Sequence, residues 1–169
     1  CLVFYHPADP AALRAEQDAL LLEVWQACNK SGHELLLEVI LPENGPDKDE
    51  RHYHTMLEHF YQLGIKPDWW KLPPLSSACW QQITALIERE DPWSRGILIL
   101  GLDAPSDKLR AGFAEAAAHP MIKGFAVGRT IFGLPSLRWM QGELIDEALI
   151  EEVKRNYLTL IGYWREPRR

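Results

Sequence analysis

A lysine within an apolar segment is the first candidate for chemistry. Lys71 lies near the end of residues 67–72, a segment that includes Trp69 and Trp70. If this segment is a strand, alternation places Lys71 on the same face as Trp69. Burial disfavours the ammonium form and so favours the neutral amine that attacks a carbonyl to form an imine. The alternative is a structural lysine whose ammonium reaches the rim of the fold and pairs with an acid.

A carboxylate occupies a similar position in an earlier apolar segment. Glu38 is the one charged residue of the run 35–41. Burying it without a partner is costly, so it needs a cation or a proton. Near an imine-forming lysine it would move protons while a carbinolamine forms and a carbon–carbon bond is cleaved. The alternative is a structural ion pair with Lys71 or with an arginine at the rim, and both roles can hold together.

Glycines and an arginine at the last expected strand suit a phosphate group. Gly128 and Arg129 follow the segment 123–127, and backbone amides together with a guanidinium are typical phosphate ligands. Gly101 and Asp103 end the preceding expected strand and would form the opposite half of such a site. Taken alone, the Gly-Arg pair is more typical of a turn glycine beside a surface arginine.

Histidines give a weaker indication of function. His6 ends the first expected strand and is a candidate substrate-binding residue. His52 and His54, with His59 beyond them, could hold the metal of a class II aldolase. No carboxylate-histidine set recurs at the expected strand ends, so we interpret these three as exposed positions on a charged helix. We therefore expect neither a metal nor another cofactor.

The elements that must position these residues follow an alternating pattern. Short apolar runs alternate with segments of helical periodicity, which is typical of parallel strands joined by helices. A dinucleotide-binding sheet would show a Gly-x-Gly-x-x-Gly turn after its first strand, and this turn is missing at residues 6–9. Polar residues end the strands instead, as in (β/α)8 barrels. The expected strands are residues 2–5, 34–41, 65–72, 97–102 and 123–127. The expected helices are residues 10–28, 52–63 (a short one), 76–90 and 106–119, with a return to helix after Gly133 and a last long helix at 146–164.

These elements predict an α/β fold of the TIM-barrel type. Five β/α units cannot close an eight-stranded barrel. The chain begins at Cys1, without methionine, and runs at once into an expected strand. We therefore expect residues 1–169 to form the C-terminal part of one barrel domain, strands four to eight, with three further units upstream.

Composition excludes several classes of partner. The formal net charge is -6 and the 18 basic residues are scattered, so we expect no nucleic-acid partner. The three cysteines are widely spaced, which argues against a disulfide framework or a zinc knuckle and favours a reducing cytoplasm. No apolar run approaches the roughly 20 residues that cross a bilayer, and the N-terminus has no leader pattern. We expect a cytoplasmic protein without a membrane partner.

Six segments of the chain carry a family resemblance. They are residues 1–7, 33–38, 66–72, 91–96, 101–105 and 123–132. Together they closely resemble the aldolase-like domain that is fused behind 5-dehydro-2-deoxygluconokinase in bacterial inositol catabolism, and the resemblance covers essentially the whole chain. That domain is in turn distantly similar to tagatose-1,6-bisphosphate aldolase, a class I barrel enzyme.

The resemblance implies a role for each candidate. Lys71 would be the imine lysine, Glu38 the acid-base carboxylate, and Gly128 and Arg129 the phosphate ligands. Relatives often have an acid two residues after the lysine, whereas Pro73 stands here, so no role follows for a second carboxylate nearby. The implied substrate is a phosphorylated keto-sugar acid, 2-deoxy-5-keto-gluconate 6-phosphate, cleaved to dihydroxyacetone phosphate and malonate semialdehyde. The implied partner is a fused or associated sugar kinase, and we also expect a homo-oligomer.

Two other functions fit the same sequence. One is a phosphosugar isomerase or epimerase on the same barrel, and the other is a non-catalytic module that supports a fused sugar kinase. A fold alone does not decide between them. Trapping of an imine distinguishes the aldolase from both, while sugar-phosphate binding without turnover favours the module.

Overall fold

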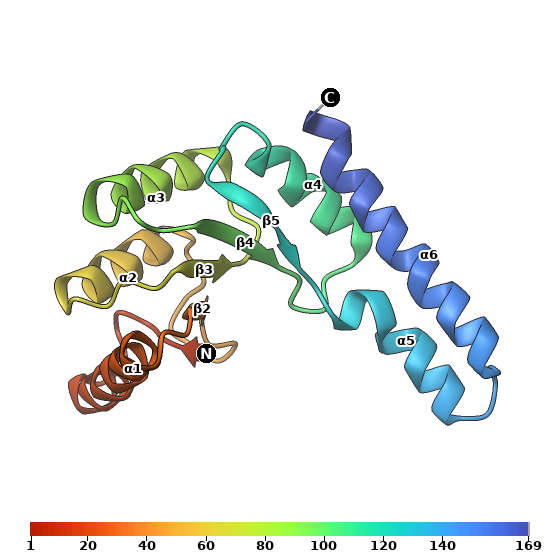
Figure 1. The fold of residues 1–169 in the computed structure, drawn as a ribbon, viewed down its shortest axis with the longest axis horizontal. Coiled ribbons are helices and arrows are strands. Elements are labelled where there is room, and N and C mark those ends of the chain that lie inside the picture. The colour runs from red at the N-terminus through yellow and green to blue at the C-terminus, as the bar shows by residue number, and fades with distance from the viewer. Residues whose placement is uncertain (169) are drawn as a thin grey trace.

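The computed structural model describes residues 1–168 and shows an α/β fold built on one five-stranded parallel sheet (Figure 1). The strands lie side by side in chain order, which confirms the predicted parallel arrangement. They are β1 (Leu2–Phe4), β2 (Leu36–Ile40), β3 (Trp69–Leu72), β4 (Gly96–Leu100) and β5 (Ile122–Ala126). The helices are α1 (Ala11–Ser31), α2 (Arg51–Gln62), α3 (Ser77–Glu90), α4 (Ser106–Ala116), α5 (Arg129–Met140) and α6 (Asp146–Arg165), followed by the 3-10 turn η1 (Glu166–Arg168).

The third strand is shorter than its sequence predicts. The apolar run covers residues 65–72, but β3 begins only at Trp69. Pro67 has no amide hydrogen for a strand ladder. The carboxylate of Asp68 accepts a hydrogen bond from the Leu35 amide (2.9 Å), so a side chain takes the place of a ladder contact just before the strand.

The helix after the last strand begins earlier than expected. The sequence predicts a return to helix after Gly133, whereas α5 begins at Arg129 and includes Pro135 in its interior. Proline lacks the amide hydrogen that would bond to the carbonyl four residues earlier, that of Ile131. The side-chain amide of Asn156 on α6 donates to this carbonyl instead (2.8 Å). A contact between helices therefore replaces the missing bond.

The two faces of the sheet differ in their cover. Successive strand residues point to opposite faces. Helices α1 to α4 pack against one face and complete a single apolar core with it (Figure 1). Strand residues in this core are Val3, Leu37, Val39, Trp70, Leu72, Ile97, Ile99 and Ile122. The strand residues that alternate with these point to the opposite face, and they include the partly exposed Leu36, Glu38, Trp69, Lys71 and Leu98.

Trp70 is the largest fully buried side chain of the covered face. Its ring stacks on Phe60 of α2 with a centroid separation of 6.3 Å. Its indole N–H donates to the Tyr61 hydroxyl (2.9 Å), so the one polar atom of the ring is satisfied. Burial raises the pKa of Tyr61, because an ionised phenol would be poorly solvated here. This contact joins β3 firmly to α2.

The outer edge of β1 is partly covered by a helix. Residues on either side of Phe4 bond to β2, as in the bond from the Tyr5 amide to the Ile40 carbonyl (3.1 Å). The backbone of Phe4 therefore points away from β2. Gln17 of α1 donates its side-chain amide to the Phe4 carbonyl (2.7 Å). A helix side chain thus takes the place of a neighbouring strand at this position.

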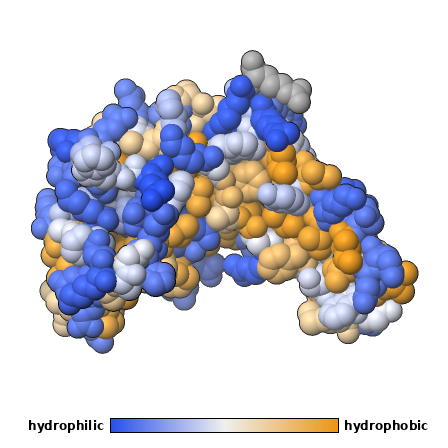
Figure 2. All heavy atoms as spheres, in the orientation of Figure 1, coloured by the Kyte–Doolittle hydropathy of each residue, from blue (hydrophilic) through white to orange (hydrophobic). Residues whose placement is uncertain are grey.

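Helices α5 and α6 pack against each other beyond β5 and expose apolar side chains, which gather over this region in Figure 2. The exposed apolar residues here include Leu134, Leu137, Met140, Ile145, Ile150 and Leu158. Even so, none of the helices within residues 1–168 is long and apolar enough to span a membrane.

Candidate active site

A cavity of about 310 Å³ opens on the uncovered face of the sheet, at the carboxyl ends of its strands. Parallel pairing brings these ends to one edge, so residues far apart in the sequence meet here. The cavity brings together six of the seven predicted site residues: Glu38, Lys71, Gly101, Asp103, Gly128 and Arg129.

Lys71 and Glu38 form an ion pair in this cavity. They are direct neighbours in the register of β2 and β3. The ammonium Nζ of Lys71 lies 2.8 Å from Oε2 of Glu38, and the two side chains are 19% and 20% exposed. The structural alternative for Glu38, an ion pair with Lys71, is therefore present. Both groups also line the cavity, so the pair has access to a bound molecule.

A tight turn ends β4 and presents Asp103 to the cavity. Leu102 and Asp103 have φ values of 46° and 59°, in the left-handed region that residues with a side chain rarely adopt. At Gly101 a Cβ atom would lie 2.8 Å from Cγ1 of Val127, so glycine allows the ends of β4 and β5 to approach closely. Uncommon backbone conformations of this kind are often found at functional sites.

The other wall of the cavity is the beginning of α5. Gly128 immediately precedes the helix, and Arg129 and Thr130 form its first turn. The first amides of a helix have no partner within it and favour an anion. Thr130 donates its hydroxyl to the Ala104 carbonyl (3.1 Å), which ties the helix to the turn after β4. Sequence reasoning did not select Thr130, although its place directly after the Gly-Arg pair could have indicated it.

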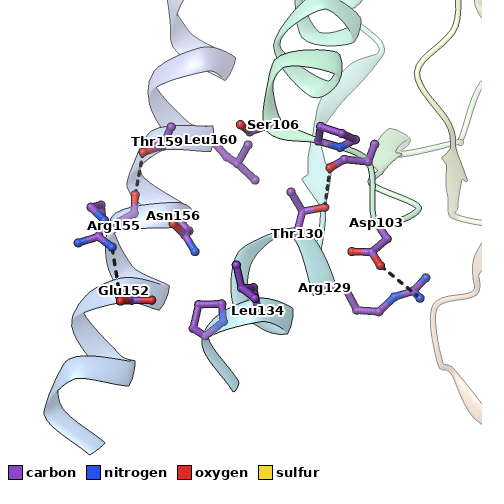
Figure 3. Close-up of a pocket in the computed structure, with 13 residues that line it drawn as sticks. Asp103, Ser106, Arg129, Thr130, Leu134, Glu152, Arg155, Asn156, Thr159 and Leu160 are labelled. Carbon is purple, nitrogen blue, oxygen red and sulfur yellow. Dashed lines mark hydrogen bonds and ion pairs between the residues drawn. The ribbon is translucent and has the colours of Figure 1, made fainter. Parts of the chain in front are cut away.

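Arg129 and Asp103 both line the cavity, and their side chains face each other (Figure 3). Their closest N and O atoms are 3.8 Å apart, and both side chains are well exposed, at 66% and 57%. An ion pair this open to water contributes little to stability, typically about 1 kcal/mol or less. The guanidinium can therefore exchange Asp103 for a phosphate at small cost.

Two larger cavities adjoin this one, and Arg129 lines all three. One of about 470 Å³ lies between the beginning of α4, α5 and α6 (Figure 3). The other, of about 780 Å³, lies beneath the loop between β2 and α2 and shares Phe4, Ile40 and Leu102 with the site of Lys71. The site is therefore open toward neighbouring space that an extended ligand can occupy.

His6 lies outside the group of cavity residues. Its side chain is fully buried, and it is not among the residues of the described chain that line the cavity of Lys71. Nδ1 of His6 accepts a hydrogen bond from the Ala8 amide (3.0 Å). Its ring packs edge to face against His52 of α2, with centroids 4.6 Å apart. The structure thus places His6 with α2 rather than beside Lys71, and its role in substrate binding stays a prediction.

The histidines of α2 are more enclosed than the sequence suggested. His52, His54 and His59 are all partly buried, so their interpretation as exposed positions is wrong. His59 lies 2.9 Å from a carboxylate oxygen of Asp18 on α1, and His52 lies 2.6 Å from one of Asp47. The pattern of charged residues could not show this, because both acids belong to other elements.

Comparison with protein families matches residues 1–168 to one family model, described as an uncharacterized protein conserved in bacteria (DUF2090). The chain belongs to this family. A search of curated proteins found no match. The description of the DUF2090 family assigns no activity, so any function has to be argued from the cavity and its residues.

Proposed function

We propose that this DUF2090 chain carries the active site of a class I aldolase, a carbon–carbon lyase that cleaves a phosphorylated keto-sugar acid through an imine at Lys71. One observation carries the proposal: Lys71 and Glu38 lie 2.8 Å apart in a cavity whose other wall holds Gly128 and Arg129. The family resemblance of the sequence supports 2-deoxy-5-keto-gluconate 6-phosphate as the substrate.

Lys71 and Glu38 can divide the steps of imine formation between them. In the ion pair, the lysine is an ammonium ion and must lose a proton before it attacks. Glu38, at 2.8 Å, can accept that proton and return it to the carbinolamine hydroxyl, which leaves as water. The product is a protonated imine between Nζ of Lys71 and C5 of the substrate.

Cleavage then follows from the electron demand of the imine. A base removes the proton of the C3 hydroxyl, the C3–C4 bond breaks, and its electron pair moves into the imine to give an enamine. Carbons 1 to 3 leave as malonate semialdehyde. Protonation of the enamine at C4 and addition of water at C5 release dihydroxyacetone phosphate and the free lysine. Glu38 is the group within reach of Lys71 for these proton transfers.

The beginning of α5 would hold the phosphate. The amides of Arg129 and Thr130, in the first turn of α5, would donate to it, and the guanidinium of Arg129 adds a full positive charge. Fixing the phosphate orients the adjacent ketone toward the strand ends, where Lys71 lies. Such positioning is a large part of what a site contributes to a reaction rate.

We also propose that the sheet is part of a (β/α)8 barrel, as strands four to eight. Sequential parallel order, helices α1 to α4 on one face and a cavity at the carboxyl edge all support this. Three further β/α units would pair with the outer edges of β1 and β5. The exposed apolar surface of α5 and α6 would then pack against helices of those units.

Borohydride trapping tests the aldolase proposal directly. The full-length protein, mixed with the keto-acid phosphate and reduced, is expected to carry a covalent adduct on the peptide that contains Trp69, Trp70 and Lys71. Lys71→Met should abolish both adduct and cleavage. Lys123→Met is the control, because this exposed lysine lies at the start of β5, away from the cavity residues.

The other possible outcomes of this experiment each point to a different function. Cleavage that survives Lys71→Met rules out the imine. Tight binding of the sugar phosphate without turnover or adduct favours a module that supports a sugar kinase. Interconversion of sugar phosphates without carbon–carbon cleavage favours an isomerase or epimerase.

A further inference from the structure

A second polar cluster lies beside β1 and is separate from the cavity of Lys71. It joins His6, directly after β1, to Asp47 in the loop before α2 and to His52 in the first turn of α2. One ligand atom from each residue lies within 4.8 Å of the others. Nε2 of His52 is 2.6 Å from Oδ1 of Asp47, and Nε2 of His6 is 3.9 Å from the same oxygen.

One nitrogen in this cluster lacks a partner. His6 is fully buried, and its Nε2 has no hydrogen-bond partner among the residues that the structure describes. Buried polar atoms are nearly always satisfied, so an unpartnered nitrogen that faces an acid and a second imidazole calls for a ligand. Asp47, more than half exposed, and His52, about a quarter exposed, leave the cluster open to solvent on one side.

We propose that His6, Asp47 and His52 form a Zn²⁺ site that fastens the loop of residues 42–49 to the end of β1. Two imidazoles and one carboxylate are a common set of three protein ligands for zinc, with water as the fourth. With bonds of about 2.0–2.1 Å in a tetrahedron, ligand atoms are roughly 3.3 Å apart. The distances of 2.6 Å and 3.9 Å lie on either side of this value, so small movements of the exposed Asp47 side chain satisfy both.

The residue types of the cluster also suit a cation, because the carboxylate supplies a negative charge beside two imidazole nitrogens. The Asp49 amide donates to Oδ1 of Asp47 (3.0 Å) and so helps to hold the carboxylate in place within the loop.

Coordination of Zn²⁺ by His6 would break one hydrogen bond. Because Nδ1 of His6 accepts from the Ala8 amide, a neutral ring carries its proton on Nε2. Coordination through Nε2 moves that proton to Nδ1 and ends this hydrogen bond. The loss of this one backbone hydrogen bond should weaken zinc binding by roughly tenfold to a hundredfold.

The site would control space next to the candidate active site. The loop of residues 42–49 lines the cavity of about 780 Å³, which also contains Arg129. Zinc would hold this loop against β1 and so fix one wall of that cavity. The inference does not depend on imine chemistry at Lys71, because the three ligands do not line that cavity within the described chain.

Metal titration of the purified protein tests the proposal. After removal of metal with EDTA, Co²⁺ is added while visible absorption is recorded, and Zn²⁺ affinity is measured by calorimetry and by displacement of Co²⁺. All variants carry Cys1→Ser, since this exposed thiol could bind metal itself. We expect one equivalent of Co²⁺, a tetrahedral absorption band, and slower proteolysis of the loop once Zn²⁺ is bound.

Variants at the two accessible ligands decide the result. Asp47→Asn and His52→Ala should each weaken Zn²⁺ binding at least tenfold. His54→Ala is the matched control, because it lies on the same helix outside the cluster and should keep wild-type affinity. His6→Ala removes a buried ring and can unfold the protein, so Asp47 and His52 carry the test. Absence of the Co²⁺ band, or unchanged affinity in both variants, would overturn the site.

Discussion

The two faces of the sheet use the same strands for different purposes. On β3, Trp70 points into the helix-covered core and is fully buried, whereas its neighbour Lys71 points to the cavity and is partly exposed. On β2, Val39 and Glu38 show the same contrast. One face therefore supplies stability, and the other carries the candidate catalytic groups. Because adjacent residues serve different ends, substitutions one position apart should have opposite consequences.

The largest expected effect on stability is on the covered face. Trp70→Ala removes the contact with Phe60 and the hydrogen bond to Tyr61, so we expect the free energy of unfolding to fall by about 3–5 kcal/mol. Trp69→Ala is the matched control. Its indole donates to the exposed Glu34 (2.9 Å), and its loss should cost about 1 kcal/mol. Urea denaturation measures both, and equal losses would contradict the division between the faces.

The open face should show the reverse pattern. Glu38→Gln keeps the shape of the side chain but removes its proton-accepting charge, so we expect turnover to fall roughly 100-fold to 10,000-fold. Borohydride should still trap some adduct at Lys71, since the amine remains. The unfolding free energy should fall by about 1–3 kcal/mol, less than for Trp70→Ala, because the pair is only about a fifth exposed but glutamine can still accept a hydrogen bond from Lys71. Glu34→Gln, an acid paired with Arg95 away from the cavity, is the control and should leave turnover unchanged.

A smaller effect is expected at the phosphate end of the cavity. Arg129→Ala removes one charge-assisted contact, so sugar-phosphate binding should weaken by about 1.5–3 kcal/mol. Arg110→Ala provides the comparison, because Arg110 pairs with Glu166 (2.5 Å) outside the cavities described above. Calorimetry with the substrate and the Lys71→Met variant measures binding without turnover. An affinity equal to that of the Arg110 variant would place Arg129 among ordinary surface residues.

The smallest effect concerns a buried acid that takes no part in the cavity. Asp91 follows α3, and burial raises the pKa of its carboxyl. A pKa that is higher in the folded than in the unfolded protein means that folding favours the protonated carboxyl. The stability that Asp91 contributes is therefore present at acid pH and is lost as the pH rises toward neutral and the carboxyl ionises. Asp91→Asn should therefore gain stability over the wild type at pH 7, by about 1 kcal/mol or less, with the difference shrinking near pH 4. Urea denaturation at both pH values checks this. A less stable variant at pH 7 would mean that the ionised form is the one preferred in the fold.

Much of the fold and part of the site could be predicted from the sequence. Apolar runs located all five strands, and strand alternation with parallel order brought Glu38 and Lys71 together correctly. The start of α5 was missed, because Gly133 and Pro135 are residues that usually interrupt a helix. The helix tolerates Pro135 because a side chain of α6, Asn156, bonds to the carbonyl that the proline leaves without a partner. The contact of His6 with Asp47 was also missed, since the path of a loop depends on contacts that no local pattern encodes.

The hydrogen bond from Gln17 to the Phe4 carbonyl bears on how the protein avoids aggregation. An exposed strand edge can pair with a strand of another molecule, and such pairing requires the free carbonyls along that edge. Gln17 occupies one of them, so an incoming strand must first displace its amide. The same bond could give way to a neighbouring strand of the proposed barrel, which would offer a full ladder in exchange. Gln17 thus hinders a strand of another molecule from pairing with β1, while a strand of the proposed barrel could still replace its single hydrogen bond.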